Sequence, residues 1–191
     1  MKFGVKKLAT MAVLSALSIA LMLLIKFPLI PAAPYLIYEP ADVPIFIGAF
    51  LFGPMAGLLI TVVVSAIQAS MSPDGWVGFV MHVLATGTFV VLAGLIYRKL
   101  HNIKGAIIAL VSGTIAMTLI MIPANLVIQT LFRDMEFAAV AKLLIPVIIP
   151  FNLLKAGLNS IITFVVYKRI SNIFHRLLKD TAAPATSSCE E

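Results

Sequence analysis

The last long apolar run of the chain, residues 143–167, carries three polar side chains that could take part in chemistry. Asn152, Lys155 and Asn159 are spaced i, i+3 and i+7, so on a helix they share one face. Lys155 lies about 18 Å from either end of this run, too far for its side chain to reach a membrane surface easily. A lysine at that depth costs about 2.5–3.5 kcal/mol, so it needs polar partners or a wet cavity. The spacing therefore predicts a polar site inside the protein.

A second pair of amides could line the same site. Asn125 and Gln129 are spaced i, i+4 on another apolar run, just after Pro123, which frees a backbone carbonyl. Amides and one ammonium group offer donors and acceptors to a mostly uncharged ligand, such as the edge of an imide-like or pteridine-like ring. Two simpler explanations stay open. Lys155 could pair with Asp42 for packing alone, and membrane amides often form only helix-to-helix hydrogen bonds.

Aromatic side chains could enclose a flat ring. The segment "KFPLIPAAPYLIYEPADVP", residues 26–44, holds five prolines, which predict an irregular loop that folds back over the protein as a lid. The alternative for each aromatic residue is an ordinary core or lipid-facing position. The candidates in this loop and the following runs are Tyr35, Tyr38, Phe46, Phe50 and Trp76.

The composition indicates that a membrane surrounds this site. The 191 residues are 61% hydrophobic and only 12% charged, about half the charge usual in a soluble domain. The apolar runs do not alternate, so they predict helices rather than barrel strands. We predict an all-α, multi-pass bundle in one domain, residues 1–172, and a polar tail without fixed structure, residues 173–191. The six predicted transmembrane helices are residues 8–25, 45–52, 54–71, 76–97, 105–132 and 143–167.

The second of these runs is too short to span alone unless it begins in the preceding loop, but the charges favour six spans. Six spans place ten of the fourteen Lys and Arg residues on one side, and cytoplasmic loops are enriched in such residues. Five spans would put "RKLHNIKG" outside. We therefore expect both termini in the cytoplasm and the chain in the cell membrane. The basic loops would contact anionic lipid headgroups, and nucleic acid is not an expected partner.

Several features argue against an enzyme. The chain has no G-x-x-x-x-G-K-[ST], H-E-x-x-H or G-x-S-x-G motif. Cys189 is the only cysteine, so no internal disulfide is possible, and neither a metal nor a cofactor is expected. His82 is predicted to form a helix-to-helix hydrogen bond. An intramembrane enzyme using Lys155 or His82 stays open as an alternative, as does a passive channel or assembly subunit.

Small residues form a stripe along the first apolar run. Ala12, Ala16 and Ala20 repeat at i, i+4 and i+8, and such a stripe lets another helix approach closely. Packing inside the bundle is one explanation for this alanine stripe. A docking surface for a partner protein is the other.

Together these features resemble a known family. The stretches "EPADVPIFIGAFLFGPMAG", "MSPDGWVGFVMHVLATGTF" and "PFNLLKAGLNS" are similar to the substrate-binding S components of energy-coupling factor (ECF) vitamin transporters, and among them to the riboflavin-specific ones. The resemblance covers about residues 5–172. It implies that the chain captures riboflavin outside the cell and works with a transmembrane coupling subunit (EcfT type) and two ATPase subunits (EcfA type). S components for thiamine, biotin or folate are the nearest alternative.

The resemblance also implies roles for individual residues. Asn125, Asn152 and Lys155 match the family's ligand-binding positions, and the alanine stripe matches the surface that contacts the coupling subunit. The proline-rich loop matches the lid. Riboflavin would be the transported ligand and not a cofactor. We add six neighbours to the predicted binding site: Gln129, Tyr38, Asp42, Val77, Gly78 and Met81.

Overall fold

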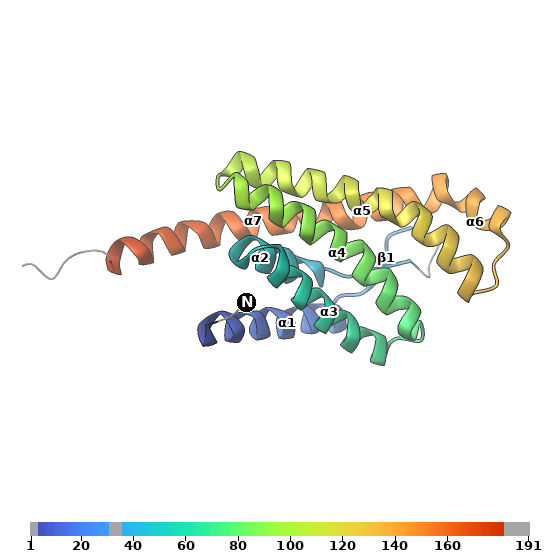
Figure 1. The fold of residues 1–191 in the computed structure, drawn as a ribbon, viewed down its shortest axis with the longest axis horizontal. Helices are drawn as coiled ribbons and strands as arrows, with labels where there is room; N and C mark the ends of the chain where they lie inside the picture. The colour runs from blue at the N-terminus through green and yellow to red at the C-terminus, as the bar shows by residue number, and fades with distance from the viewer. Residues whose placement is uncertain (1–3, 31–35, 182–191) are drawn as a thin grey trace, which may run out of the picture.

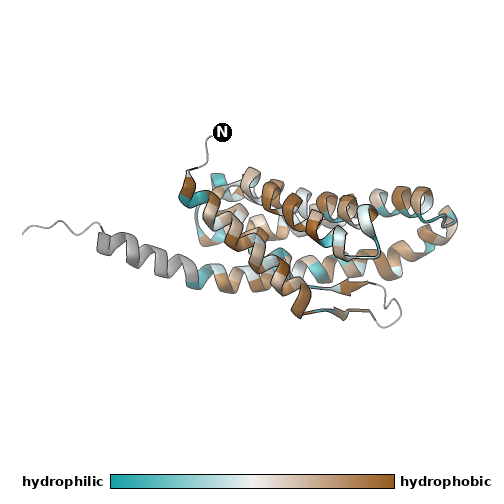
Figure 2. Cartoon of the chain, turned by 90° about the horizontal axis from the view of Figure 1, so that it is seen from below, coloured by the Kyte–Doolittle hydropathy of each residue, from teal (hydrophilic) through white to brown (hydrophobic). Residues whose placement is uncertain are grey.

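The computed structural model describes residues 4–30 and 36–181, with side-chain surroundings up to residue 169. Its elements are α1 (Val5–Leu24), β1 (Phe27–Pro28), β2 (Ile37–Tyr38), α2 (Asp42–Phe52), α3 (Pro54–Met71), α4 (Gly75–Lys99), α5 (Ile103–Phe132), α6 (Phe137–Leu143), a π-helical segment (Leu144–Ile148) and α7 (Ile149–Thr181). The helices lie along one long axis (Figure 1). Apolar residues cover the helices along their length (Figure 2).

The predicted all-α membrane fold is confirmed. Five helical units are long and apolar enough to cross a bilayer: α1, α3, α4, α5 and the continuous unit that begins with α6. Helix α2 has 11 residues. That is about 16 Å of helix, roughly half of a hydrocarbon core. The six-span count and the cytoplasmic termini therefore stay predictions.

Helix α2 and the hairpin before it together lead the chain back along the bundle. Strands β1 and β2 pair antiparallel, with Phe27 opposite Tyr38. Helix α2 then begins near the middle of the bundle and runs toward the end where α1 starts (Figure 1). There the Lys7 ammonium donates a hydrogen bond to the Phe52 carbonyl at 3.1 Å. The loop that we predicted to be irregular thus contains a short hairpin, and its residues 31–35, with Tyr35, lie outside the described residues.

Helix α2 is the centre of the core, since residues 42–50 are all buried. The Phe46 ring stacks on Phe89 with 3.7 Å between centroids, and both side chains are 0% exposed. The Phe50 ring stacks on Tyr97 at 4.5 Å. Of the two explanations weighed for Phe46 and Phe50, the structure therefore supports the ordinary core position, because both rings are occupied by core partners.

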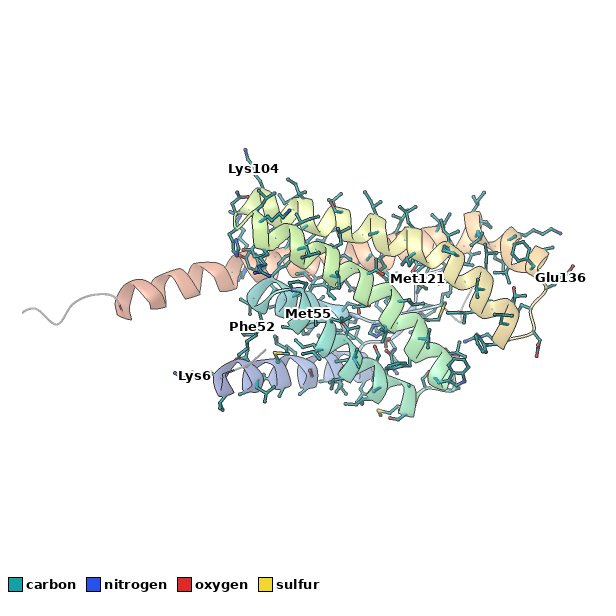
Figure 3. The ribbon with its side chains drawn as sticks, viewed as in Figure 1. Lys6, Phe52, Met55, Lys104, Met121 and Glu136 are labelled. Atoms are coloured by element: carbon teal, nitrogen blue, oxygen red, sulfur yellow. The ribbon has the colours of Figure 1, made fainter. Side chains whose placement is uncertain are left out.

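Charged side chains lie at both ends of the bundle. Lys6 and Lys104 lie at one end and Glu136 at the other (Figure 3). At the Glu136 end, the Arg133 guanidinium is paired with the Asp74 carboxylate, and the exposed Trp76 packs edge-on against Phe132 with 4.5 Å between centroids. This distribution agrees with the charge asymmetry on which the orientation was predicted.

The last helical unit differs from its prediction at both ends. It begins at Phe137 rather than at residue 143, passes through the π-helical segment, and continues to Thr181, beyond the boundary that we set at residue 172. In the π-helical segment, the Ile149 amide donates to the Leu144 carbonyl, a spacing of five residues. Residues 182–191, with Cys189, lie outside the described residues.

Candidate functional site

A buried hydrogen-bond network surrounds Asp42, the first residue of α2. The Asp42 side chain is 1% exposed. Its Oδ1 accepts hydrogen bonds from His82 Nε2 at 2.9 Å and from Thr86 Oγ1 at 3.0 Å, both on α4. Its Oδ2 accepts from Asn159 Nδ2 on α7 at 3.1 Å. Every carboxylate oxygen thus has a partner, which is what burial of a charge requires.

The network continues to a further helix through His82. Its Nδ1 lies 2.6 Å from Ser65 Oγ on α3. His82 therefore bridges α2 and α3, and its predicted helix-to-helix role is confirmed. Because α2, α3, α4 and α7 all contribute, this network fixes how the four helices sit together.

The strand that leads into α2 is held by several of these helices. The Tyr38 hydroxyl donates to Asn159 Oδ1 at 2.8 Å, and Tyr38 is only 4% exposed. Next in sequence, the Glu39 carboxylate accepts a hydrogen bond from the Gln68 amide of α3. The Ser18 hydroxyl of α1 donates to the Ala41 carbonyl. Residues 38–42 are therefore anchored to α1, α3, α4 and α7.

The predicted ligand-binding amides are buried on α5 and α7. Asn125 is 5% exposed and Asn152 is 4% exposed. Each side-chain nitrogen donates at 2.8 Å to the carbonyl four residues earlier in its own helix. The Gln129 amide nitrogen lies 3.4 Å from Asn125 Oδ1, and the Gln129 amide oxygen is buried without a hydrogen-bond partner. These amides therefore retain donor or acceptor capacity.

Lys155 is half-buried on the same face of α7 as Asn152 and Asn159. Within residues 4–30 and 36–169, however, its ammonium group forms neither a hydrogen bond nor an ion pair. Because Asn159 contacts Tyr38 and Asp42, this polar face of α7 points toward β2 and the start of α2.

Helices α5 and α7 run antiparallel, which sets the level of the amides. Thr114 Oγ1 and Ser160 Oγ lie 3.2 Å apart. Asn125 lies eleven residues after Thr114 on α5, and the corresponding level of the antiparallel α7 is eleven residues before Ser160, at residue 149. That level is about one helical turn from Asn152. The structure thus brings the amides of both helices to neighbouring levels of the bundle.

Comparisons with known proteins agree with this arrangement. The family model described as "ECF transporter, substrate-specific component" matches residues 6–167. The chain is 32% identical to "Riboflavin transporter RibU" of Staphylococcus aureus (strain TCH60), over 90% of this chain and 94% of that protein.

It is also 29% identical to "Riboflavin transporter FmnP" of Bacillus subtilis (strain 168), over 87% of this chain and 92% of that protein. A solved structure, "Structure and mechanism of the S component of a bacterial ECF transporter", matches with a TM-score of 0.77 and 32% identity. It covers 88% of this chain and 97% of that chain.

The chain belongs to the family of ECF transporter substrate-specific components.

Family membership decides against two of the earlier alternatives. An S component is the substrate-specific part of a transporter, so Lys155 and His82 need not be explained by an intramembrane enzyme or a passive channel. The buried network around His82 is accordingly an arrangement of helix-to-helix hydrogen bonds.

The alanine stripe of this S component lies on its outer surface. Ala12, Ala16 and Ala20 are all exposed, whereas the opposite face of α1 is buried through Met11, Ser15, Ser18 and Met22. Packing within the bundle is therefore the wrong explanation for the stripe. It forms a shallow apolar surface that another helix could approach.

The remaining predicted site residues lie at the start of α4. Val77, Gly78 and Met81 are half-buried, and Gly78 precedes His82 by one turn on the same face. Val77 and Met81 have apolar side chains and Gly78 has none, so these positions can line a site but add no side-chain donor to the polar network. A hollow of about 470 Å³ lies along α4 beside Leu58 of α3, and another of about 230 Å³ lies at the corner between α2 and α3. Neither includes any of the predicted binding residues.

Sequence reasoning missed most of the Asp42 network. It weighed Asp42 as a partner of Lys155, but the structure pairs the carboxylate with His82, Thr86 and Asn159. A signal was present, since Asp42 directly precedes an uncharged stretch that runs to Pro73. A buried carboxylate at that position needs several hydrogen-bond donors from the neighbouring helices.

Proposed function

We propose that this chain is the riboflavin-binding S component of an ECF transporter. Its family membership and its similarity to two proteins named riboflavin transporters support this function. The observation that carries the proposal is the polar face of α7, where the Lys155 ammonium group remains without a direct hydrogen bond among the described residues. A membrane protein keeps such a group where it contacts a substrate or water.

The chemistry of riboflavin fits these residues. One edge of the isoalloxazine ring alternates carbonyl acceptors with an N–H donor, and a carboxamide can pair with both. Asn125 and Asn152 each use one amide hydrogen for a bond to their own helix, so the second hydrogen can serve the ligand. The Asn152 oxygen can also accept from the ligand, and the Asn125 oxygen keeps one lone pair beside its long contact with the Gln129 amide. Lys155 then donates to a ring carbonyl or a ribityl hydroxyl, which requires no negative charge on the ligand.

The hairpin acts as the lid in this proposal. Tyr38 ends the hairpin and contacts Asn159 on the binding face of α7, so movement of the hairpin changes how that face is covered. A flat, rigid ligand loses little conformational freedom when such a lid closes over it.

Transport itself depends on partners. We propose that this S component sits in the cell membrane and docks through the alanine stripe onto a transmembrane coupling subunit of the EcfT type. Two ATPase subunits of the EcfA type would drive reorientation and release. The exposure of Ala12, Ala16 and Ala20 supports this surface, because small side chains allow close helix approach.

Riboflavin titration of the purified chain in detergent tests the proposal through quenching of flavin fluorescence. Lys155→Met should weaken binding by about 10- to 150-fold, the effect of losing one charged hydrogen bond. Lys142→Met is the matched control, because Lys142 is exposed on α6 and lies outside the predicted site.

Saturable binding of thiamine, biotin or folate in place of riboflavin would reassign the ligand while leaving the S-component role intact. Equal affinities in wild type and Lys155→Met would remove Lys155 from the site.

A further inference from the structure

A small basic cavity lies at the corner where α2 turns into α3. Its volume is about 230 Å³. It is lined by Ala49, Phe50, Leu51, Phe52, Gly53, Pro54, Met55, Gly94, Arg98 and His101. The cavity belongs to the end of the bundle that carries Lys6 and Lys104 (Figure 3), and it is lined by the last residues of α2, whereas Asp42 is the first.

The backbone of this corner is fixed by its sequence. Gly53 has φ of 90°, in the left-handed region that favours glycine, and Pro54 starts α3 in a conformation suited to a first helical residue. Gly94 of α4 lets this corner approach closely, because a Cβ there would lie 2.9 Å from Pro54 Cα. The path of the backbone at this corner is therefore well defined.

The groups that line the cavity favour an anion. Arg98 follows Gly94 by one turn, so its permanently charged guanidinium lies on the face that meets the corner. His101 adds an imidazole, and the 18-residue helix α3 directs its positive N-terminal end to the same place. None of the lining residues is acidic. The negative C-terminal end of α2 also lies at this corner, and there the Phe52 carbonyl accepts a hydrogen bond from Lys7.

An apolar groove continues from this cavity along the same two helices. Its volume is about 470 Å³. The lining residues are Leu58, Val83, Leu84, Gly87, Thr88, Val91, Leu92 and Leu95. On α3, Leu58 follows Pro54 of the basic cavity by one turn, and on α4, Leu95 directly follows Gly94. The two hollows are therefore neighbouring parts of one α3–α4 seam.

The dimensions of the seam match one membrane leaflet. From Leu84 to Leu95 the groove follows eleven residues of α4, about 17 Å of helix. Half of a bilayer hydrocarbon core is about 15 Å. The basic cavity then lies where the headgroups of that leaflet would be.

We propose that the α3–α4 seam binds an anionic phospholipid. Its phosphate would contact Arg98, His101 and the N-terminal end of α3, while one acyl chain would lie in the apolar groove. Such a site goes beyond the proposed vitamin binding and shares none of its residues. It also differs from diffuse attraction of basic loops to a charged membrane, because a defined cavity and groove select one lipid molecule.

Native mass spectrometry of the full chain, released from detergent with added lipid, tests this site. Palmitoyl-oleoyl phosphatidylglycerol should be retained in preference to the matched phosphatidylcholine. Arg98→Gln should reduce its retention by about fivefold, since one basic side chain near an anionic headgroup contributes a factor of that size. Lys104→Gln is the control, because Lys104 is exposed at the same end and does not line the cavity.

Two further arms separate a lipid from a free phosphate. Inorganic phosphate should not displace phosphatidylglycerol, and dihexanoyl phosphatidylglycerol should bind more weakly than the long-chain lipid because it cannot fill the groove. Equal losses in Arg98→Gln and Lys104→Gln would overturn the site. Displacement by inorganic phosphate, or equal binding of the short-chain lipid, would overturn its assignment to a phospholipid. Riboflavin affinity, measured on each variant, reports that the fold is intact.

Discussion

Replacing Asp42 by alanine removes the acceptor at the centre of the buried network. The carboxylate is 1% exposed and accepts hydrogen bonds from His82, Thr86 and Asn159. In Asp42→Ala these three donors remain in a space that the bundle closes to water. Breaking a buried, hydrogen-bonded pair of this kind costs about 3–5 kcal/mol of unfolding free energy. For a chain of this length, each kcal/mol lowers the Tm by about 2–4 °C, so the expected loss is about 6–20 °C.

Asp74→Ala is the matched control, because it makes the same substitution at a surface ion pair. Asp74 is 51% exposed and its partner Arg133 is 38% exposed. Exposed pairs contribute about 0–1 kcal/mol, which corresponds to a Tm change of at most about 4 °C.

The assay is thermal unfolding of both variants in the same detergent without ligand, followed by far-ultraviolet circular dichroism. If Asp42→Ala lowered the Tm no further than Asp74→Ala does, the network would have no structural importance and our reasoning about it would be wrong.

Three further variants or ligands test other parts of the molecule. Ala16→Trp should leave riboflavin affinity unchanged but reduce uptake by cells that carry the whole transporter. Val165→Trp, at an exposed position of α7, is the control and should leave uptake unchanged. Normal uptake with Ala16→Trp would contradict the docking role. FMN should bind no more tightly than riboflavin, because Lys155 is the only cation in the predicted site, and a clear preference for FMN in titrations would refute this ligand assignment. Gly94→Leu should lower the Tm because overpacking costs about 1–3 kcal/mol of unfolding free energy, and even the new Cβ would meet Pro54. Gly157→Leu is the control, since a Cβ at Gly157 would meet nothing within 4 Å. Equal Tm losses in the two variants would count against this account.

The helices of this chain could be predicted closely from the sequence. The predicted run 54–71 coincides with α3, and the run 76–97 lies within α4, Gly75–Lys99. Backbone groups in a bilayer must be paired within their own segment, so an uncharged run of sufficient length has few alternatives to a helix. The break at Gly53-Pro54 was predictable for a local reason, since it needs one glycine with positive φ and one proline at a helix start.

Features that depend on contacts distant in sequence could not be predicted. The β1–β2 pairing joins segments on either side of residues 31–35, and proline content alone indicates only that no helix forms there. Asp42 finds partners 40, 44 and 117 residues away, and no local pattern fixes such distances.

Burial of individual residues was equally ambiguous at the level of sequence. Phe46 and Phe50 suit a ligand pocket and a packed core equally well, and only the position of α2 in the centre of the bundle decides for the core. A stripe of alanines likewise fits both a buried and an exposed helix face. By contrast, Asn152 and Asn159 were placed on one face by their spacing, and both are buried.

The π-helical segment before α7 also affects how sequences of this family should be aligned. A single π-turn accommodates one more residue than the α-helical turn it replaces, without rotating the helix that comes after it. A homologue that lacks one residue between Leu144 and Ile148 would regain a regular α-helix and still present its Asn-x-x-Lys pair in the same direction. Loss of one residue within this segment would therefore leave the direction of Lys155 unchanged. A one-residue deletion between Ile149 and Lys155 would instead turn Lys155 by about 100° and aim it at the lipid or a neighbouring helix.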